Sequence, residues 1–532
     1  MMTKLKYSLL LAIMPLLCIS CYEDKGNYTY SEKEVVTITL PDNLKVMSRA
    51  EYINFDPTIV SSLNGDIAAD NKNYTFGCKI NYQYYNSKTG ETENWTDIDS
   101  AKTKTVNYFA KLPAGTYKIM YDVTNVGTGV TTSILGNVSL LSATSEGWMV
   151  LNNVGTENRV RLDMISTDSK GNMVTARDVM GDKAPALYNG TQVMINPSKF
   201  WNGEGLFLMS KSGGYRLNVS TLQTTETDNM KLTDFILSTT PGQPVSMIIV
   251  NKGGTSGPLS RVCVTDVGNA YALTSNASGA SFEDPINTNT RGTAPTYSVS
   301  PMIGTSMARP GNSSCVLLYD NTNKRFMGWN YGATDNHITF ALNDPDGVSK
   351  KFSYKTGMDL VAMKSTRYSD GLVYSVLQDA QKLRHIYGIN LSGSQFTQES
   401  IYENITAEHF NDASDYAFHS QYPFMFYSYG NKVYCYNLGT GAVSDVLTLD
   451  AGETVTMLKF NLFVNMQLSD LADHSDEFLA KQYQLIVGSS TSASDGGFVR
   501  FYAIDNTGKM TKKEEYKGFG KVVDVTYRER RK

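Results

Sequence analysis

The sequence predicts an all-β chain in two parts: a β-sandwich of immunoglobulin type over residues 34–143 and a seven-bladed β-propeller over residues 145–532. Two observations lead to this fold class. Before residue 143, several short segments alternate apolar and polar residues with a period of two, which is typical of a sheet with one buried face. After Ser145, an apolar strand followed by a polar turn and a second strand recurs seven times.

Residues 1–20 are predicted to be a lipoprotein signal peptide. Two lysines precede an apolar run over residues 9–17, which is shorter than the about 20 residues needed to span a bilayer. Ser20 is a small residue of the kind that a lipoprotein signal peptidase accepts before the lipid-bearing cysteine, Cys21. A plain secretion signal is the alternative. Residues 21–33 then form a lipidated, extended tether to the membrane.

The sandwich follows from four alternating segments. The expected strands cover residues 35–40, 74–84, 117–123 and 134–140. About 110 residues with this pattern fit one immunoglobulin-like sandwich.

The propeller follows from the seven hairpins at an irregular spacing of roughly 55 residues, close to the kelch range. The expected strand pairs are 148–151 with 159–162, 205–209 with 214–217, 247–250 with 261–264, 315–319 with 325–329, 372–376 with 383–387, 424–427 with 432–436, and 484–488 with 499–502. The segment 522–527 is expected to close the ring, and a helix-like insert is expected over 469–480. Two further sandwiches in tandem are the alternative architecture.

Composition narrows the function classes. A formal net charge of −4 and a pI of about 5.9 give no electrostatic case for binding nucleic acid. The cysteines that remain after processing and lipidation are Cys78, Cys263, Cys315 and Cys435. They are expected to be mostly buried thiols, and one long-range disulfide stays open.

No catalytic, metal or cofactor site is predicted. The segment Gly304–Pro310 resembles the nucleophile segment of subtilisin-like proteases, but all five histidines follow Ser306 and the required base should precede it. We therefore read this segment as a loop between blades. No His-Glu-x-x-His motif is present, so zinc hydrolysis lacks its ligands. Glycoside hydrolysis stays open, because its carboxylate pair is defined only by separation in space.

Three aromatic residues are candidate ligand contacts. Trp201, Trp329 and Tyr331 lie at expected strand ends or in loops, where exposed rings bind a sugar face or a peptide side chain. The alternative is that they fill the core between blades. Trp148 is expected to be a core anchor at the domain junction.

The start of the mature chain, Cys21–Tyr28, resembles the PKD-like lipoproteins of Bacteroides-type bacteria, and Leu112–Lys118 resembles a late strand of PKD/Ig-like domains. The resemblance implies an outer-membrane lipoprotein facing the cell exterior, with Glu23 and Asp24 at acidic export-signal positions. It also implies an accessory subunit that works with a SusC-like TonB-dependent transporter and a SusD-like lipoprotein.

The expected function is non-catalytic capture of substrate for such an importer. Oligopeptides are favoured over glycans because 33 tyrosines and 4 tryptophans suit mixed peptide surfaces better than sugar stacking. A glycan-binding subunit, an adhesin and a surface glycoside hydrolase are the alternatives.

Overall fold

The computed structural model describes most of the chain after the tether. The described residues are 32–42, 44–81, 95–98, 102–142, 144–168, 170, 172–181, 184–196, 205–218, 222–224, 242–252, 259–273, 282–306, 312–313, 315–331, 337–392, 395–462 and 479–528. The signal peptide, most of the tether including Cys21, and most of the expected insert over 469–480 lie outside them. No helix among these residues is long and apolar enough to cross a membrane.

Internal contacts divide the chain into two compact units. The smaller comprises Met1–Leu44, Ile53–Tyr108 and Tyr117–Val138, and the larger comprises Lys45–Tyr52, Phe109–Thr116 and Ser139–Lys532. Strands β1 to β10 form sheets in the orders β1-β4-β5, β2-β10-β9-β6-β7 and β3-β8. Their bounds are β1 Val36–Thr39, β2 Leu44–Met47, β3 Tyr52–Phe55, β4 Thr58–Ser61, β5 Gly65–Asp66, β6 Tyr74–Asn81, β7 Trp95–Asp97, β8 Val106–Phe109, β9 Gly115–Asn125 and β10 Thr131–Leu141.

The period-two pattern positions the core of the smaller unit as predicted. Along β6 the side chains of Tyr74, Phe76 and Cys78 are buried, and the residues between them are more exposed. On β9, Tyr121 pairs with Cys78 and is also buried. Because successive strand residues point to opposite faces, one face of each strand supplies the core.

Glu34, at the entry to the smaller unit, holds a cluster of hydrogen bonds. Its carboxylate accepts from the Ser61 and Tyr74 hydroxyls and from the side-chain amides of Asn125 (2.6 Å) and Asn64 (3.2 Å). The pKa of Glu34 falls to about 2, mainly because the hydroxyls of Ser61 and Tyr74 stabilise the ionised form.

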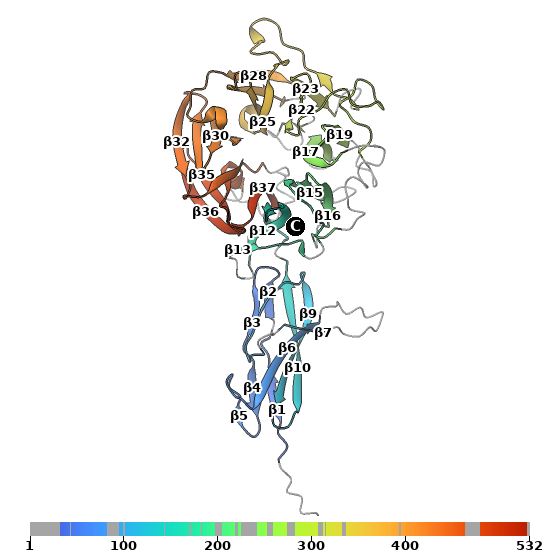
Figure 1. The fold of residues 1–532 in the computed structure, drawn as a ribbon, viewed down its shortest axis with the longest axis vertical. Helices are drawn as coiled ribbons and strands as arrows, with labels where there is room; N and C mark the ends of the chain where they lie inside the picture. Colours follow the sequence, from blue (N-terminus) through green and yellow to red (C-terminus); the bar gives the residue numbers. More distant parts are fainter. Residues whose placement is uncertain are drawn as a thin grey trace, which may run out of the picture. The chain divides into compact units, whose positions relative to one another are not determined.

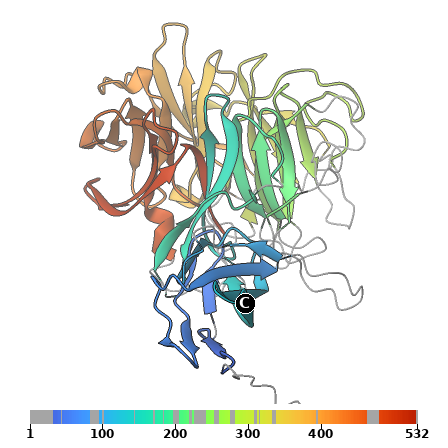
Figure 2. The same cartoon turned by 60° about the horizontal axis from the view of Figure 1, so that its bottom comes forward.

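The larger unit holds seven sheets within the described residues, one for each predicted hairpin (Figures 1 and 2). The orders are β13-β12-β11-β37, β14-β15-β16, β19-β18-β17-β21, β20-β22-β23-β24, β25-β26-β27-β28, β29-β30-β31-β32 and β33-β34-β35-β36. Packed radially, sheets of this kind make a propeller, because each one covers the apolar face of the next. The fold class predicted from the sequence is therefore confirmed.

The strands of the first four sheets are β11 Gly147–Val154, β12 Arg159–Thr167, β13 Met173–Ala176, β14 Gly190–Asn196, β15 Gly205–Ser210, β16 Gly213–Leu217, β17 Pro244–Lys252, β18 Leu259–Thr265, β19 Ala270–Leu273, β20 Gly304–Thr305, β21 Asn312–Ser313, β22 Cys315–Asp320, β23 Arg325–Asn330 and β24 Phe340–Ala341.

The later strands are β25 Asp359–Ser365, β26 Leu372–Gln378, β27 Arg384–Asn390, β28 Thr397–Tyr402, β29 Asp415–Phe418, β30 Phe424–Tyr429, β31 Lys432–Asn437, β32 Ala442–Thr448, β33 Thr454–Lys459, β34 Leu485–Ser490, β35 Gly497–Ile504, β36 Met510–Phe519 and β37 Lys521–Arg528. Short 3₁₀ turns cover Gly347–Ser349, Tyr368–Asp370, Phe410–Asp412 and Lys481–Tyr483.

The C-terminal strand joins the first sheet. β37, red in Figures 1 and 2, pairs antiparallel with β11, with Trp148 opposite Tyr527 and Val150 opposite Val525. Trp148 is buried and packs against Phe501 of the last sheet and the edge of Tyr527, with ring centroids 4.8 and 4.9 Å apart. The first and last sheets therefore share one aromatic core, and the last strand of the chain closes the ring as predicted.

Candidate functional site

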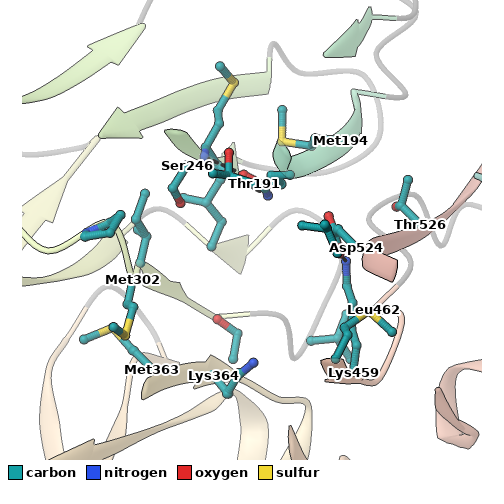
Figure 3. A pocket seen from close by; sticks show the side chains of 18 of the residues that line it. Thr191, Met194, Ser246, Met302, Met363, Lys364, Lys459, Leu462, Asp524 and Thr526 are labelled. Carbon is teal, nitrogen blue, oxygen red and sulfur yellow. Dashed lines mark hydrogen bonds and ion pairs between the residues drawn. The ribbon is translucent and has the colours of Figure 1, made fainter. Parts of the chain in front are cut away.

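A central cavity of about 810 Å³ lies where the seven sheets meet. Its wall is built from β14, β17, β25, β29, β33 and β37, together with residues 301–303 just before β20. The volume falls within the roughly 300–1,000 Å³ range of ordinary ligand pockets. Figure 3 shows the cavity from close by, with side chains from several different sheets around it. Because every sheet contributes, the cavity exists only when the ring is complete.

One half of the wall carries charges that alternate from strand to strand. Lys364 of β25 pairs with Asp415 of β29 across 3.0 Å, and Lys459 of β33 pairs with Asp524 of β37 across 2.7 Å. These four side chains form what we call the charged belt. It crosses four consecutive sheets, so its members also connect neighbouring blades.

Both carboxylates of the charged belt are occupied on their second oxygen as well. Asp415 Oδ2 accepts from the backbone N–H of Leu458 at 2.7 Å, and Asp524 Oδ2 accepts from that of Val193 at 3.1 Å. Each aspartate therefore joins its own strand to both neighbours. Such charge-assisted bonds are stronger than neutral ones.

Two uncharged side chains make the same kind of connection elsewhere in the ring. The Gln192 amide of β14 donates to Met247 O (3.0 Å) and accepts from Met247 N (2.8 Å), so it pairs with β17 as a peptide group would. Ser365 Oγ of β25 accepts from Thr305 N of β20 at 3.0 Å. With the charged belt, polar side chains thus join six pairs of adjacent sheets.

The rest of the wall is rich in thioethers. The methionines that line it are Met194, Met247, Met302, Met363 and Met457. Three of them are labelled in Figure 3, with the hydroxyl-bearing Thr191 and Ser246 close to Met194. Methionine is unbranched and polarizable, so such a wall adapts to apolar groups of different shape.

The described residues give mixed outcomes for the predicted ligand contacts. Trp201 and Cys21 lie outside the described residues. Trp329 lies in β23 and is fully buried in the apolar cluster between the third and fourth sheets, so the prediction that it is an exposed contact is wrong. Inward-facing strand positions bury large rings because they contribute the most apolar area. Tyr331 is half-buried against the same cluster, and its role as a contact stays a prediction.

Only Gly304, Thr305 and Ser306 of the protease-like segment lie within the described residues, and the first two belong to a blade strand rather than to a loop. Gly304 and Thr305 form β20, and Ser306 follows with 3% of its surface exposed. Gly304 sits against the next sheet, where an added Cβ would lie 2.6 Å from Val373 Cγ1. Close packing between sheets therefore explains a small residue here without any reference to catalysis.

His385 and His409 each lie beside one carboxylate, that of Asp379 and that of Glu408. His419 is buried, and desolvation lowers its pKa to about 4. No group of three metal-ligating side chains gathers in the part of the chain that the structure describes. The four described cysteines are buried free thiols, as predicted: Cys78, Cys263, Cys315 and Cys435. Burial raises the pKa of Cys315 and Cys435 to about 12.

Sequence reasoning missed the charged belt. Its one visible signal is a charge inside an otherwise apolar strand, such as Asp524 between Val523 and Val525, or Lys459 after Met457 and Leu458. A buried-strand position rarely carries a charge unless a partner is present. Nothing in the sequence names those partners, because they come from strands 51 and 65 residues away.

Fold and site together define a β-propeller with a central ligand-sized cavity, preceded by a PKD-like, Ig-like β domain. Residues 21–197 match the model of the PKD-like family. A search of curated proteins finds no match.

Several solved structures are similar in outline. A crystal structure of a quinoprotein alcohol dehydrogenase-like protein from Bacteroides thetaiotaomicron has 11% identity and a TM-score of 0.45, covering 92% of this chain and 97% of its own. Apo AztD from Citrobacter koseri has 9% identity and a TM-score of 0.33, with coverage of 85% and 98%. A DUF4784 family protein from Bacteroides caccae has 9% identity and a TM-score of 0.27, with coverage of 93% and 98%. Likeness at this level carries no argument about ligand or activity.

Proposed function

We propose that this protein is a non-catalytic lipoprotein of the outer-membrane surface that captures oligopeptides in the central cavity of its propeller. In this role it is an accessory subunit of a SusC/SusD-type TonB-dependent importer. The signal peptide and Cys21 support the anchor, and the PKD-like match over residues 21–197 supports the family context.

The observation that carries the capture role is the central cavity itself. It has the size of a ligand pocket, and all seven sheets contribute to its wall. Three carboxylates of the described chain line it. Asp415 and Asp524 are engaged on both oxygens in joining strands, and Asp266 accepts at Oδ1 from the backbone N–H of Gln243. A general acid or base must reach the proton that it transfers, whereas these groups hold the wall in place. The arrangement supports binding without chemistry.

The aromatic groups of the wall favour peptide over glycan. Phe418 is buried and stacks on Tyr374 with ring centroids 4.3 Å apart, and Phe460 is buried beside Phe426 and His419. Both rings are therefore buried in aromatic contacts, while a sugar stacks on an open ring face. Among the five described methionines that line the wall, Met302 is half-buried and the other four are buried, so Met302 is the thioether that can adapt to varied peptide side chains.

A tethered subunit of this kind needs only modest affinity. Holding a peptide beside the transporter raises its effective concentration, so a dissociation constant of roughly micromolar to millimolar is sufficient. We therefore expect a stable complex with the importer pair and weaker binding of free substrate.

The test is a pull-down of tagged full-length protein from its own membrane in mild detergent, with mass spectrometry of the partners. We expect a SusC-like transporter and a SusD-like lipoprotein, and we expect Cys21→Ala to move the protein into soluble fractions. Recovery of the protein alone, together with turnover of a peptide or glycan, would replace the accessory role by a hydrolase. A complex that binds only glycan would keep the role and change the ligand.

A further inference from the structure

The hydrogen-bonding capacity of the charged belt is unequal for donors and acceptors. A lysine ammonium carries three donors and no acceptor. Lys364 and Lys459 each use one donor on their aspartate, and neither has a further partner among the described residues. Their side chains keep 33% and 31% of their surface exposed, so the remaining donors are accessible from the cavity.

The aspartates of the charged belt are less available. Asp524 keeps only 10% of its side-chain surface exposed and Asp415 keeps 25%. Each is bound at one oxygen by a lysine and at the other by a backbone N–H of the next strand. A ligand that reaches the charged belt therefore meets free ammonium donors, while the acceptors of the belt are turned toward the wall. The other two charged side chains that line the cavity within the described structure are Lys211 and Asp266, and both are exposed.

Another part of the wall holds a hydroxyl without a partner. Thr191 Oγ1 is buried and has no hydrogen-bond partner within the described structure. Thr191 lines the cavity beside Ser246 (Figure 3). A buried hydroxyl without a partner costs free energy, and because a hydroxyl both donates and accepts, a ligand group of either kind would remove that cost.

We infer that the cavity recognises a carboxylate of the captured oligopeptide, which accepts hydrogen bonds from the ammonium groups of Lys364 and Lys459. This inference rests on the proposed function and names the chemical group of the ligand that the cavity binds. The two ammonium groups lie on β25 and β33, the strands that flank β29, so they approach the cavity from either side of Asp415.

The two parts of the wall then bind different parts of the peptide. The ammonium groups bind a group that every free peptide carries, its terminal carboxylate, through charge-assisted hydrogen bonds. Met302, the least buried methionine of the wall, contacts a side chain without demanding one shape. The result is a site that selects for free peptides and tolerates many sequences, which is what a general capture subunit requires.

The experiment compares tetra-alanine with its C-terminal amide, titrated calorimetrically into the purified full-length lipoprotein in detergent. Losing a charge-assisted bond corresponds to about 10-fold to 100-fold in affinity, so we expect the amide to bind weaker by that factor. This comparison needs no variant and is therefore independent of any folding defect.

Variants then locate the effect. Lys459→Met and Lys364→Met should each weaken binding of the free acid about 10-fold and leave binding of the amide unchanged. The matched control is Lys521→Met, because Lys521 is an exposed residue of the same unit that does not line the cavity. Thermal melts verify that each variant is folded.

Three results would overturn the inference. Equal binding of acid and amide removes the role of the carboxylate, and absence of binding by both peptides removes the peptide site. Tighter lysine-dependent binding of digalacturonate, titrated in a parallel arm, assigns the carboxylate to a sugar acid instead. In each case the pull-down above reports separately on the importer complex, so failure of this inference is distinguishable from failure of the proposed function.

Discussion

Asp524 is the residue whose loss should open the propeller at the point where it closes. β37 is the last strand of the chain and completes the first sheet by pairing with β11. Asp524 connects this strand to Lys459 of β33 on one side and to Val193 N of β14 on the other. We expect Asp524→Asn to keep an acceptor for the backbone N–H but to leave the Lys459 ammonium without its counter-ion.

The exposed fractions of the two side chains set how much stability is lost when the Asp524–Lys459 pair is broken. Breaking a fully buried pair costs about 3–5 kcal/mol, and an exposed pair contributes about 0–1 kcal/mol. Asp524 keeps 10% of its side-chain surface exposed and Lys459 keeps 31%, which places the pair between these limits. We therefore expect about 1.5–3 kcal/mol, close to the value of one hydrogen bond to a charged group.

Native-state hydrogen exchange with mass spectrometry measures this effect strand by strand. Local opening free energies set amide protection, and about 1.4 kcal/mol is a tenfold change, so β37 amides should exchange roughly 10-fold to 100-fold faster. Asp415→Asn is the matched control, because Asp415 also binds one lysine ammonium, on β25, and one backbone N–H, on β33. It should loosen those strands and spare β37. Unchanged protection of β37 in Asp524→Asn, or equal loss in both variants, would refute the reasoning.

Three further predictions concern single residues. The Glu34 pKa is about 2 in the folded state against 4.5 for a free glutamate, so the stabilising effect of the ionised carboxylate is complete above pH 4.5 and is lost as the pH falls toward 2. Calorimetry should show the smaller unit of the wild type melting at a lower temperature as the pH falls over that range. The melting temperature of Glu34→Gln should depend less on pH. Trp329→Ala should lower the stability of the larger unit by about 3–5 kcal/mol in thermal or urea unfolding, and weaker peptide binding without any loss of stability would restore Trp329 as a contact. Ser306→Ala should leave binding and stability unchanged, and labelling of the buried Ser306 by a fluorophosphonate probe would contradict this.

Much of the fold was predictable because its signals are local. Alternation with a period of two depends only on neighbouring residues, so it reveals strands before any contact is known. All seven predicted hairpins form antiparallel pairs, such as Cys315 opposite Asn330 and Phe424 opposite Asn437. The expected closing segment 522–527 lies within β37. A hairpin joins strands that are adjacent in the chain, so it can be recognised from a short stretch of sequence.

The site was not predictable in the same way. Trp329 and Trp148 look alike in the sequence as aromatic residues on short strands, and both are buried. Whether a strand residue faces the core, the cavity or solvent depends on the sheet that packs against it, and local sequence does not specify that neighbour. An aromatic residue on its own was therefore a poor guide to the ligand.

The sequence by itself determined the strands, their pairing into hairpins, the repeat that makes a ring, and the candidate anchor at Cys21, since each depends on composition or on neighbours along the chain. Only the tertiary structure decided what lies at the centre. Lys364, Asp415, Lys459 and Asp524 come from four different blades and meet only after the ring closes. Their role depends on distances in space between strands far apart in sequence, and closure of the ring is the physical event that sets those distances.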